Sequence, residues 1–322
     1  MARAERGKPK KPKEIDLHVW SSKTFQSLAN LSGFHRRAVR TVKFSPDGIK
    51  LLSIGDDNNH SVAIYDWEKR RMLCNAKCDP AKIFTAVWTS NSDFVCVGQK
   101  VIKFFNQKGS NLTPKKGLFG TMKQVPLLSC EYAWGDIFTG TSKGHIIRWA
   151  GRKAGKEFTV ARKEQIWGLH FNGEHLIAGA MNGLILFYRD NMTIDRRIEL
   201  AKHTSCPPGI RALDWQPDMQ KLLIGTRGAE IFEITADEEV LCYMHGHYEG
   251  ELWGAAAHPE SQMFASAGGD KTVRVWDTHR MVKSSDELAE ELRCVEWTND
   301  GKYLICGAVK GVIYSLDAES LM

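Results

Sequence analysis

The sequence lacks the features that mark membrane and secreted proteins. Among its 322 residues, no apolar run approaches the ~18 that a helix needs to cross a bilayer. The basic N-terminus, MARAERGKPKKPKE, is not followed by the apolar segment of a secretory signal. The eight cysteines show no paired spacing, so we expect reduced thiols in a cytosolic or nuclear protein with no membrane partner.

Motifs of several enzyme classes are also missing. There is no G-x-G-x-x-G dinucleotide fingerprint, no G-x-x-x-x-G-K-[ST] phosphate loop and no H-E-x-x-H zinc motif. We therefore expect no enzyme activity, no catalytic residue and no cofactor. Sustained helical periodicity is scarce as well. Only SSDELAEELR, at 284–293, carries a helix-capping pattern, and a charged loop is an equal alternative there.

Tryptophan and glycine, by contrast, are abundant. Ten Trp and 28 Gly against ten Pro indicate many short strands joined by tight turns. One pattern recurs every 39 to 45 residues: an alternating strand, a polar turn, an apolar strand ending near Gly, a turn, and a strand ending in or near an aromatic residue. The seven copies lie at 39–67, 84–105, 127–149, 166–188, 210–234, 252–277 and 292–316.

These units predict an all-β fold. Strands that are apolar on both faces must be covered by neighbouring sheets, and packing several sheets around an axis achieves this with few exposed edges. The sequence therefore predicts a seven-bladed WD-repeat β-propeller over residues 15–322, preceded by a basic disordered tail at 1–14. Because the last unit has no room for a fourth strand, we expect residues 15–31 to close the ring, with 25–31 as the outer strand of the last blade. The role of 17–20 stays open.

The sixth unit carries the strongest motif. Gly246-His247 precedes its first strand, Ser266 lies in the second, Asp270 occupies the next turn and Trp276-Asp277 closes the third. This pattern resembles the WD repeat, and the resemblance implies a buried network in which His247 links Asp270 to Ser266 and then to the Trp276 indole. Unpaired buried polar groups cost ~1–3 kcal/mol each, so such a network is structural.

A metal site near this motif is the competing hypothesis. His245 and His247, with Glu249 and Glu251, offer possible ligands, but zinc needs three or four that converge tetrahedrally. We expect Cys242 to face elsewhere on its strand. The repeat-histidine interpretation is favoured, and no metal is expected.

Charge is segregated along the chain. Residues 100–163 contain thirteen basic and three acidic side chains, whereas 230–322 contain seven basic and eighteen acidic ones. In a propeller, sequence order is angular order, so the first segment becomes a basic sector that could attract an acidic partner. Five of its candidate contacts lie in two expected loops, the long connection 106–120 and the link 151–157, and a sixth, Lys123, follows the first loop. They are Lys115, Lys116, Lys123, Arg152, Lys153 and Lys156.

Several longer stretches resemble one family. GFHRRAVRTVKFSPDG at 33–48, SIGDDNNHSVAIYDW at 53–67 and GHYEGELWGAAAHP at 246–259 are similar to the echinoderm microtubule-associated protein-like family, over almost the whole chain. The resemblance implies tandem propellers that bind tubulin or microtubules, a cytoplasmic, cytoskeletal location and partners with acidic surfaces. The family's coiled coil and the hydrophobic motif before its first propeller are absent, so we expect a fragment or a shortened relative.

Two other functions remain as alternatives. The propeller could be a general scaffold that binds peptides of other proteins. The basic sector could bind nucleic acid, which is disfavoured because such surfaces interleave exposed aromatic and basic residues. Here four aromatics lie nearby, Phe104, Phe105, Phe119 and Trp149, and three of them are expected to be buried because they end strands.

Overall fold

The computed structural model describes residues 15–278 and 280–322. These residues form twenty-nine β-strands and three 3-10 helices of three residues each, so the all-β prediction is confirmed. In the described part of the chain, no helix has the length and apolar character needed to span a membrane. The predicted disordered tail at 1–14 lies outside the described residues.

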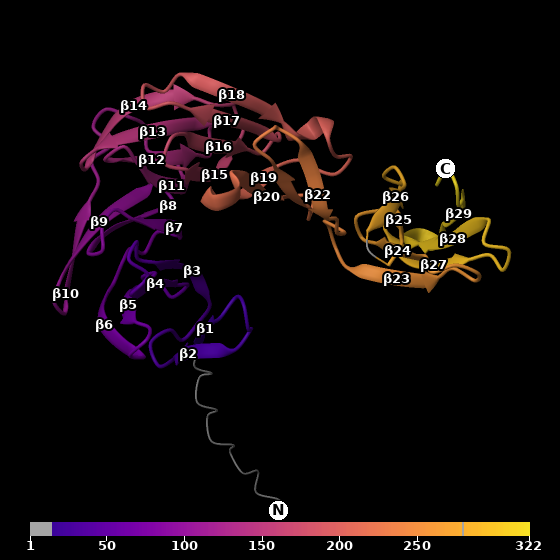
Figure 1. Cartoon of the computed structure of the whole chain (residues 1–322), viewed down its shortest axis with the longest axis horizontal. Helices are drawn as coiled ribbons and strands as arrows, with labels where there is room; N and C mark the ends of the chain where they lie inside the picture. Colours follow the sequence, from indigo (N-terminus) through magenta and orange to yellow (C-terminus); the bar gives the residue numbers. More distant parts are fainter. Residues whose placement is uncertain (1–14, 279) are drawn as a thin grey trace, which may run out of the picture. The chain divides into compact units, whose positions relative to one another are not determined.

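Each predicted repeat unit forms its own sheet (Figure 1). The first four sheets consist of β3 (Val39–Phe44), β4 (Lys50–Gly55), β5 (Val62–Asp66) and β6 (Arg71–Ala76); β7 (Ile83–Trp88), β8 (Asp93–Gly98), β9 (Val101–Lys108) and β10 (Asn111–Lys116); β11 (Leu127–Ala133), β12 (Asp136–Thr141), β13 (His145–Ala150) and β14 (Lys153–Thr159); and β15 (Ile166–Phe171), β16 (Leu176–Ala180), β17 (Leu184–Tyr188) and β18 (Ile194–Glu199).

Three further sheets follow the 3-10 helix η1 (Leu200–Lys202). They consist of β19 (Ile210–Gln216), β20 (Lys221–Thr226), β21 (Ile231–Ile234) and β22 (Val240–Met244), with η2 (Pro217–Met219) between the first two strands; β23 (Leu252–Ala257), β24 (Phe264–Gly268), β25 (Val273–Trp276) and β26 (Met281–Ser284); and β27 (Leu292–Trp297), β28 (Tyr303–Ala308) and β29 (Ile313–Asp317), with η3 (Val309–Gly311) before the last strand. This is the sheet pattern of a WD-repeat β-propeller, and its closure into one seven-bladed ring stays a prediction.

The hydrophobic cores lie between successive sheets. Leu52 and Ile64 of the first sheet share a buried cluster with Phe94 of the second, and Val275 of the sixth shares another with Leu304 of the seventh. Fully burying such a side chain contributes about 1.5–3 kcal/mol. Central strands such as β4, β5, β16 and β17 are therefore covered on both faces, as their apolar runs indicated, whereas β20 and β28 keep exposed apolar side chains.

The fourth strand of each sheet differs from the central ones. Most side chains of β10 and β14, and half of those of β6, are exposed, because each of these strands lies at the outer edge of its sheet. Their sequences carry no apolar alternation, which is why they were not identified as strands. After β26 the chain runs through residues 285–291 without a helix, so of the two alternatives for 284–293 the charged loop is correct.

A two-stranded sheet precedes the first repeat. β1 (Leu17–Trp20) pairs antiparallel with β2 (Ser27–Leu31). Leu17 and Leu31 pack against Leu51 and Tyr65 of the first four-stranded sheet, close to which Figure 1 shows both strands. Pairing of residues 25–31 with the last sheet, which has three strands, stays a prediction.

The described chain divides into two compact units. One contains residues 15–180 and 186–196, the other 181–185 and the rest of the described chain from 197 onward, so the division passes through the sheet of β15–β18. The basic segment lies in the first unit and the WD motif of the sixth repeat in the second.

We expect Leu31→Ala to destabilise the first unit by about 2–5 kcal/mol, because the side chain is 3% exposed and its loss leaves a cavity between β2 and the first sheet. Thermal and chemical denaturation followed by circular dichroism measure the change. His18→Ala, at an exposed position of the neighbouring strand, is the control and should melt like the parent protein. Equal melting of the two variants would show that residues 17–31 contribute nothing to stability.

Candidate functional site

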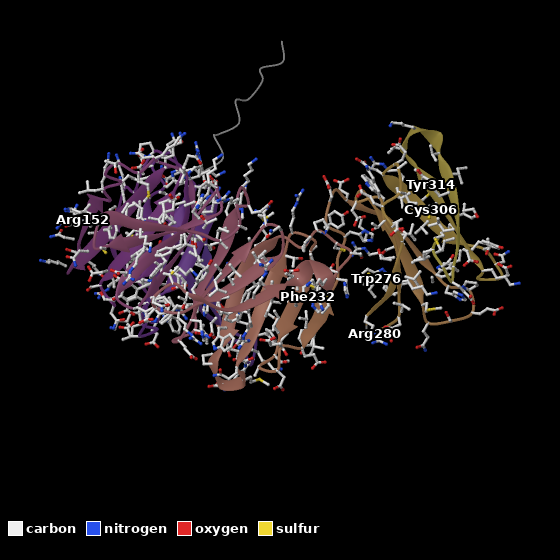
Figure 2. The ribbon with its side chains drawn as sticks, turned by 90° about the horizontal axis from the view of Figure 1, so that it is seen from above. Arg152, Phe232, Trp276, Arg280, Cys306 and Tyr314 are labelled. Carbon is white, nitrogen blue, oxygen red and sulfur yellow. The ribbon has the colours of Figure 1, made fainter. Side chains whose placement is uncertain are left out.

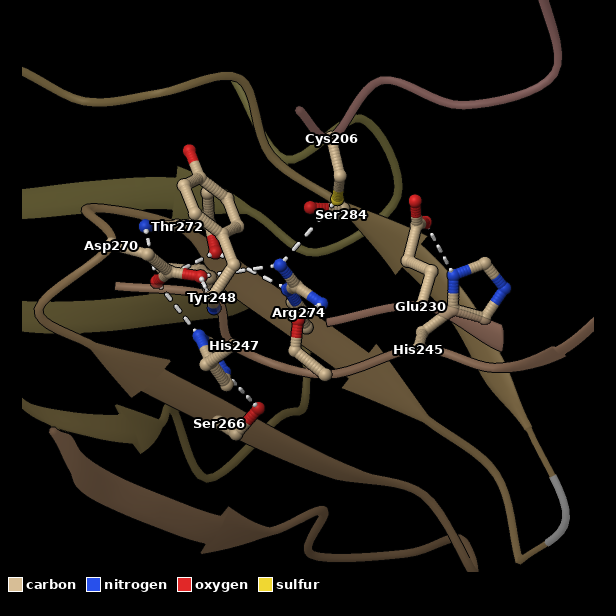
Figure 3. Close-up of polar contacts among 12 residues, drawn as sticks. Cys206, Glu230, His245, His247, Tyr248, Ser266, Asp270, Thr272, Arg274 and Ser284 are labelled. Atoms are coloured by element: carbon tan, nitrogen blue, oxygen red, sulfur yellow. Dashed lines mark hydrogen bonds and ion pairs between the residues drawn. The ribbon is translucent and has the colours of Figure 1, made fainter. Parts of the chain in front are cut away.

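The structure brings the four residues of the WD motif together, and Figure 3 shows His247 between Asp270 and Ser266. The Trp276 indole N–H donates to Ser266 Oγ at 2.7 Å. Ser266 Oγ lies 2.8 Å from His247 Nε2, and His247 Nδ1 lies 2.7 Å from Asp270 Oδ1. Since the indole can only donate and a carboxylate can only accept, the serine hydroxyl donates to Nε2 and Nδ1–H donates to Asp270. Every polar group along this chain is paired.

Arg274 extends this network and was not foreseen. Its side chain is fully buried, and it donates to Asp270 Oδ2 at 3.2 Å and to the Gly246 carbonyl. Thr272 Oγ1 donates to the other carboxylate oxygen at 3.0 Å. Arginine in the otherwise apolar strand sequence VRVW, four residues after an aspartate, was a signal for this buried ion pair.

Ionisation of Asp270 is favoured by these contacts. Burial alone would raise the pKa of its carboxyl, but the hydrogen bonds from His247 and Thr272 and the charge of Arg274 outweigh burial, so the pKa is lowered. The stability gained from the charged form is therefore present above the ordinary pKa of an aspartate and is lost as the pH falls towards the lowered value.

Parts of the same arrangement recur in other sheets. In the first, His35 Nε2 lies 2.7 Å from Ser53 Oγ, while its buried Nδ1 lacks a hydrogen-bond partner in the described structure. Burial lowers the pKa of His35, opposed by the charge of Asp57. In the third, Trp149 Nε1 donates to Thr139 Oγ1 at 2.9 Å. Other sheets thus keep hydrogen bonds at the same positions of the repeat but form them with different residue types.

A match to the serine-nucleophile pattern G-x-S-x-G occurs at 140–144, where the sequence is GTSKG. In serine hydrolases this pattern forms a sharp turn from a strand into a helix. Here it joins the antiparallel strands β12 and β13. The geometry of a nucleophile elbow is therefore not formed at Ser142.

The predicted basic contacts lie on strands rather than on projecting loops. Lys115 and Lys116 belong to β10, and Lys153 and Lys156 belong to β14, with Arg152 directly before it. The expectation that 106–120 and 151–157 are loops was wrong, because both segments continue past their turns as the outer strands of their sheets. Lys123 lies on the connection between β10 and β11, and Arg152 lies on the turn between β13 and β14.

The backbone joins these two outer strands directly. Leu118 N donates to the Arg152 carbonyl at 2.8 Å, and Ala154 N donates to the Leu118 carbonyl at 2.9 Å, which forms a parallel bridge between Leu118 and Lys153. Gly117 permits the approach, since a Cβ there would lie 2.4 Å from Ile102 Cγ2. We call the exposed cations gathered here the basic edge surface: Lys115, Lys116, Lys123, Arg152, Lys153 and Lys156.

None of these six cations has a carboxylate within ion-pair distance in the described part of the chain. The interior basic residues nearby behave differently. Lys103 Nζ lies 2.9 Å from Asp79, and Arg148 Nε lies 2.7 Å from Asp136. Figure 2 shows Arg152 at the outside of the molecule. Positive charge at this surface is therefore left unneutralised by the fold.

A groove of about 490 Å³ lies beside the basic edge surface. Lys108, Lys115 and Arg152 line it together with Phe104 and Asp93, whose carboxylate accepts hydrogen bonds from Asn106 and Ser90. The lining of the groove thus combines three cations with an aromatic ring and a single carboxylate that is already hydrogen-bonded.

Cys242 faces His245, whereas the sequence pattern had predicted that Cys242 faces elsewhere on its strand. Its Sγ lies 3.6 Å from His245 Nδ1, and Glu230 Oε1 lies 3.1 Å from the same nitrogen. The error arose because one extra residue in β22 interrupts the alternation of its side chains. Glu249 and Glu251 are exposed and outside this group.

We expect Asp270→Ala or His247→Ala to cost roughly 2–4 kcal/mol of folding free energy, because each leaves buried partners unpaired. Glu249→Ala removes an exposed carboxylate from the same segment and should be neutral. Denaturation midpoints of the three variants measure these changes in folding free energy. A parental midpoint for either network variant, together with lost binding to a partner, would assign the network to recognition instead of folding.

Comparison with known proteins agrees with this architecture. The family model described as the echinoderm microtubule-associated protein first beta-propeller matches residues 2–234, and the WD domain, G-beta repeat model matches 238–277. The chain is 27% identical to human echinoderm microtubule-associated protein-like 1 over 330 residues, which cover 98% of this chain and 40% of that protein.

Two further relatives show the same pattern. Identity is 27% over 334 residues to rat echinoderm microtubule-associated protein-like 2, covering 98% of this chain and 49% of the relative. It is 25% over 329 residues to the 77 kDa echinoderm microtubule-associated protein of Lytechinus variegatus, covering 98% and 48%. The chain thus spans less than half the length of these relatives. With most of its length matched by the first-propeller model, the chain belongs to the echinoderm microtubule-associated protein family.

Proposed function

We propose that this chain is a non-catalytic interaction module that binds tubulin or microtubules through its basic edge surface. Two observations support the proposal. The relatives are named microtubule-associated proteins. The cations of β10 and β14 are exposed, the segment after β10 is bridged to β14 through Leu118 and Lys153, and these cations have no carboxylate within ion-pair distance in the described chain.

The exposed cations of the basic edge surface favour a partner that is acidic and extended. Side chains of Lys115 and Arg152 reach the groove beside β9, so a peptide crossing the two outer strands meets several cations in succession. Such contacts are exposed and screened beyond a Debye length of about 8 Å at physiological salt. Affinity would therefore arise largely from electrostatic steering of association.

Nucleic-acid binding is supported less well at this surface. Phe105, Phe119 and Trp149 are all less than 9% exposed and are used in packing between sheets. Bases would find few aromatic faces to stack on, whereas an acidic polypeptide needs none.

Protection of the sheet edge is the structural alternative for Lys115 and Lys116. Lysine and proline on an outer strand discourage pairing with other molecules, and Pro114 precedes the two lysines. Edge protection would limit aggregation, whereas the proposed function is the binding of a partner. One set of variants therefore distinguishes the two roles.

We expect the combined variant Lys115→Glu, Lys116→Glu, Arg152→Glu and Lys153→Glu to fold normally and to bind tubulin about 10-fold or more weakly, since each exposed ion pair contributes about 0.2–1 kcal/mol. Co-sedimentation with polymerised tubulin and a binding assay with soluble tubulin measure the loss over a salt series. Binding of the parent protein should weaken steeply as salt rises.

The matched control reverses four other exposed cations that have no ion pair in the described chain: Lys23→Glu, Arg36→Glu, Lys77→Glu and Lys82→Glu. It makes the same change in net charge and should retain more affinity than the first variant. Undiminished binding by the folded first variant, or parental binding that ignores salt, contradicts the proposal. Aggregation without loss of binding would assign the lysines to edge protection.

A further inference from the structure

Three ligand-type side chains converge in the fifth sheet, apart from the basic edge surface. Atoms of Glu230, Cys242 and His245 that could each bind a metal all lie within 4.8 Å of one another. His245 Nδ1 is the shared point, 3.1 Å from Glu230 Oε1 and 3.6 Å from Cys242 Sγ. Figure 3 shows Glu230 and His245 facing each other at the end of their strands.

Strand register explains the convergence. β21 and β22 are antiparallel, with Ile231 opposite Met244 and Phe232 opposite Cys242. Glu230, directly before β21, is thus brought beside His245, directly after β22. The extra residue Tyr243 forms a bulge, which re-aims side chains on its strand.

The cluster is largely withdrawn from water while remaining reachable. Glu230 is 2% exposed, and the His245 side chain is 22% exposed. A buried carboxylate needs a positive partner or several donors, and besides His245 it receives a hydrogen bond from Thr204 Oγ1 at 2.7 Å. Arg274 forms its ion pair with Asp270.

A second thiol adjoins the cluster. Cys206 is buried on a segment that precedes β19, and its backbone N–H donates to Thr204 Oγ1, the same hydroxyl that donates to Glu230. Arg274 Nη2 lies 3.7 Å from Cys206 Sγ, a contact visible in Figure 3. Burial and the charge of Glu230 raise the pKa of the Cys206 thiol, and the charge of Arg274 opposes this only in part, so a metal that binds there would displace the thiol proton.

We propose that Glu230, Cys242 and His245 form a binding site for a zinc-type divalent cation, with Cys206 as the fourth ligand. One nitrogen, one or two thiolates and one carboxylate are a donor set that zinc accepts in tetrahedral geometry. Calcium and magnesium, which take oxygen ligands, do not fit it. Metal binding would release protons from the thiols and fix His245, two residues before His247 of the WD network, to the fifth sheet.

Cobalt titration of the reduced full-length chain tests this site, since tetrahedral Co²⁺ bound to thiolate gives characteristic sulfur-to-metal and d–d absorption bands. We expect one ion per chain, displaced by zinc. Cys242→Ser should weaken binding about 100-fold or more and diminish the sulfur band, because loss of a ligand exceeds the 10–100-fold effects of outer-shell changes. Cys206→Ser should diminish the same band.

Cys294→Ser, which removes an exposed thiol on β27, is the matched control and should titrate like the parent protein. If Cys242→Ser fails to fold by circular dichroism, the partly exposed His245→Ala replaces it; zinc should raise the melting temperature of the parent chain and the control, but not of this variant. Absence of a sulfur band, or equal binding by the parent chain and His245→Ala, means an adventitious ion only and overturns the proposal. Neither readout involves tubulin.

Discussion

Burial of the central strands on both faces is the constraint on which the rest of this structure depends. Strands such as β5 and β17 expose almost nothing, so the sheets that contain them are stable only when neighbouring sheets cover them. The clusters that join Leu52 to Phe94 and Val275 to Leu304 meet this need. Where a sheet is covered in this way, surface function is confined to the outer strand, the turns and the ends of the strands.

Polar residues between the sheets follow from the same constraint. A hydroxyl or imidazole in that environment is tolerated only with partners, and the Trp276, Ser266, His247 and Asp270 chain pairs every group. The first sheet retains a shorter version of it, and the third keeps only a threonine and a tryptophan. Polar networks of this kind fix the geometry of a turn against its sheet and need not contact any ligand.

Charged side chains lie at positions that are not needed for packing between sheets. The outer strands β10 and β14 lie at sheet edges, where lysine costs nothing in packing, and their adjacency concentrates cations that are distant in sequence. In the fifth sheet the opposite holds, because Glu230 is buried and needs a partner supplied by its own hairpin. The two proposed sites thus arise from opposite electrostatic situations and can be tested independently.

Much of the fold and part of the site could be predicted from the sequence. Apolar strands at a period near forty indicated the sheets, and the spacing of His247, Ser266, Asp270 and Trp276 indicated the network, since these signals are local and repeat. The outer strands were missed because an edge strand needs no apolar alternation: Lys115 and Lys153 follow polar segments that form strands only by pairing with β9 and β13. Cys242 was misplaced because a single extra residue in β22 reverses which face a side chain takes. The sequence by itself thus determined which residues are buried and repeat, through local hydrophobicity. Only the tertiary structure decided which distant side chains meet, because pairing register and bulges depend on contacts between strands.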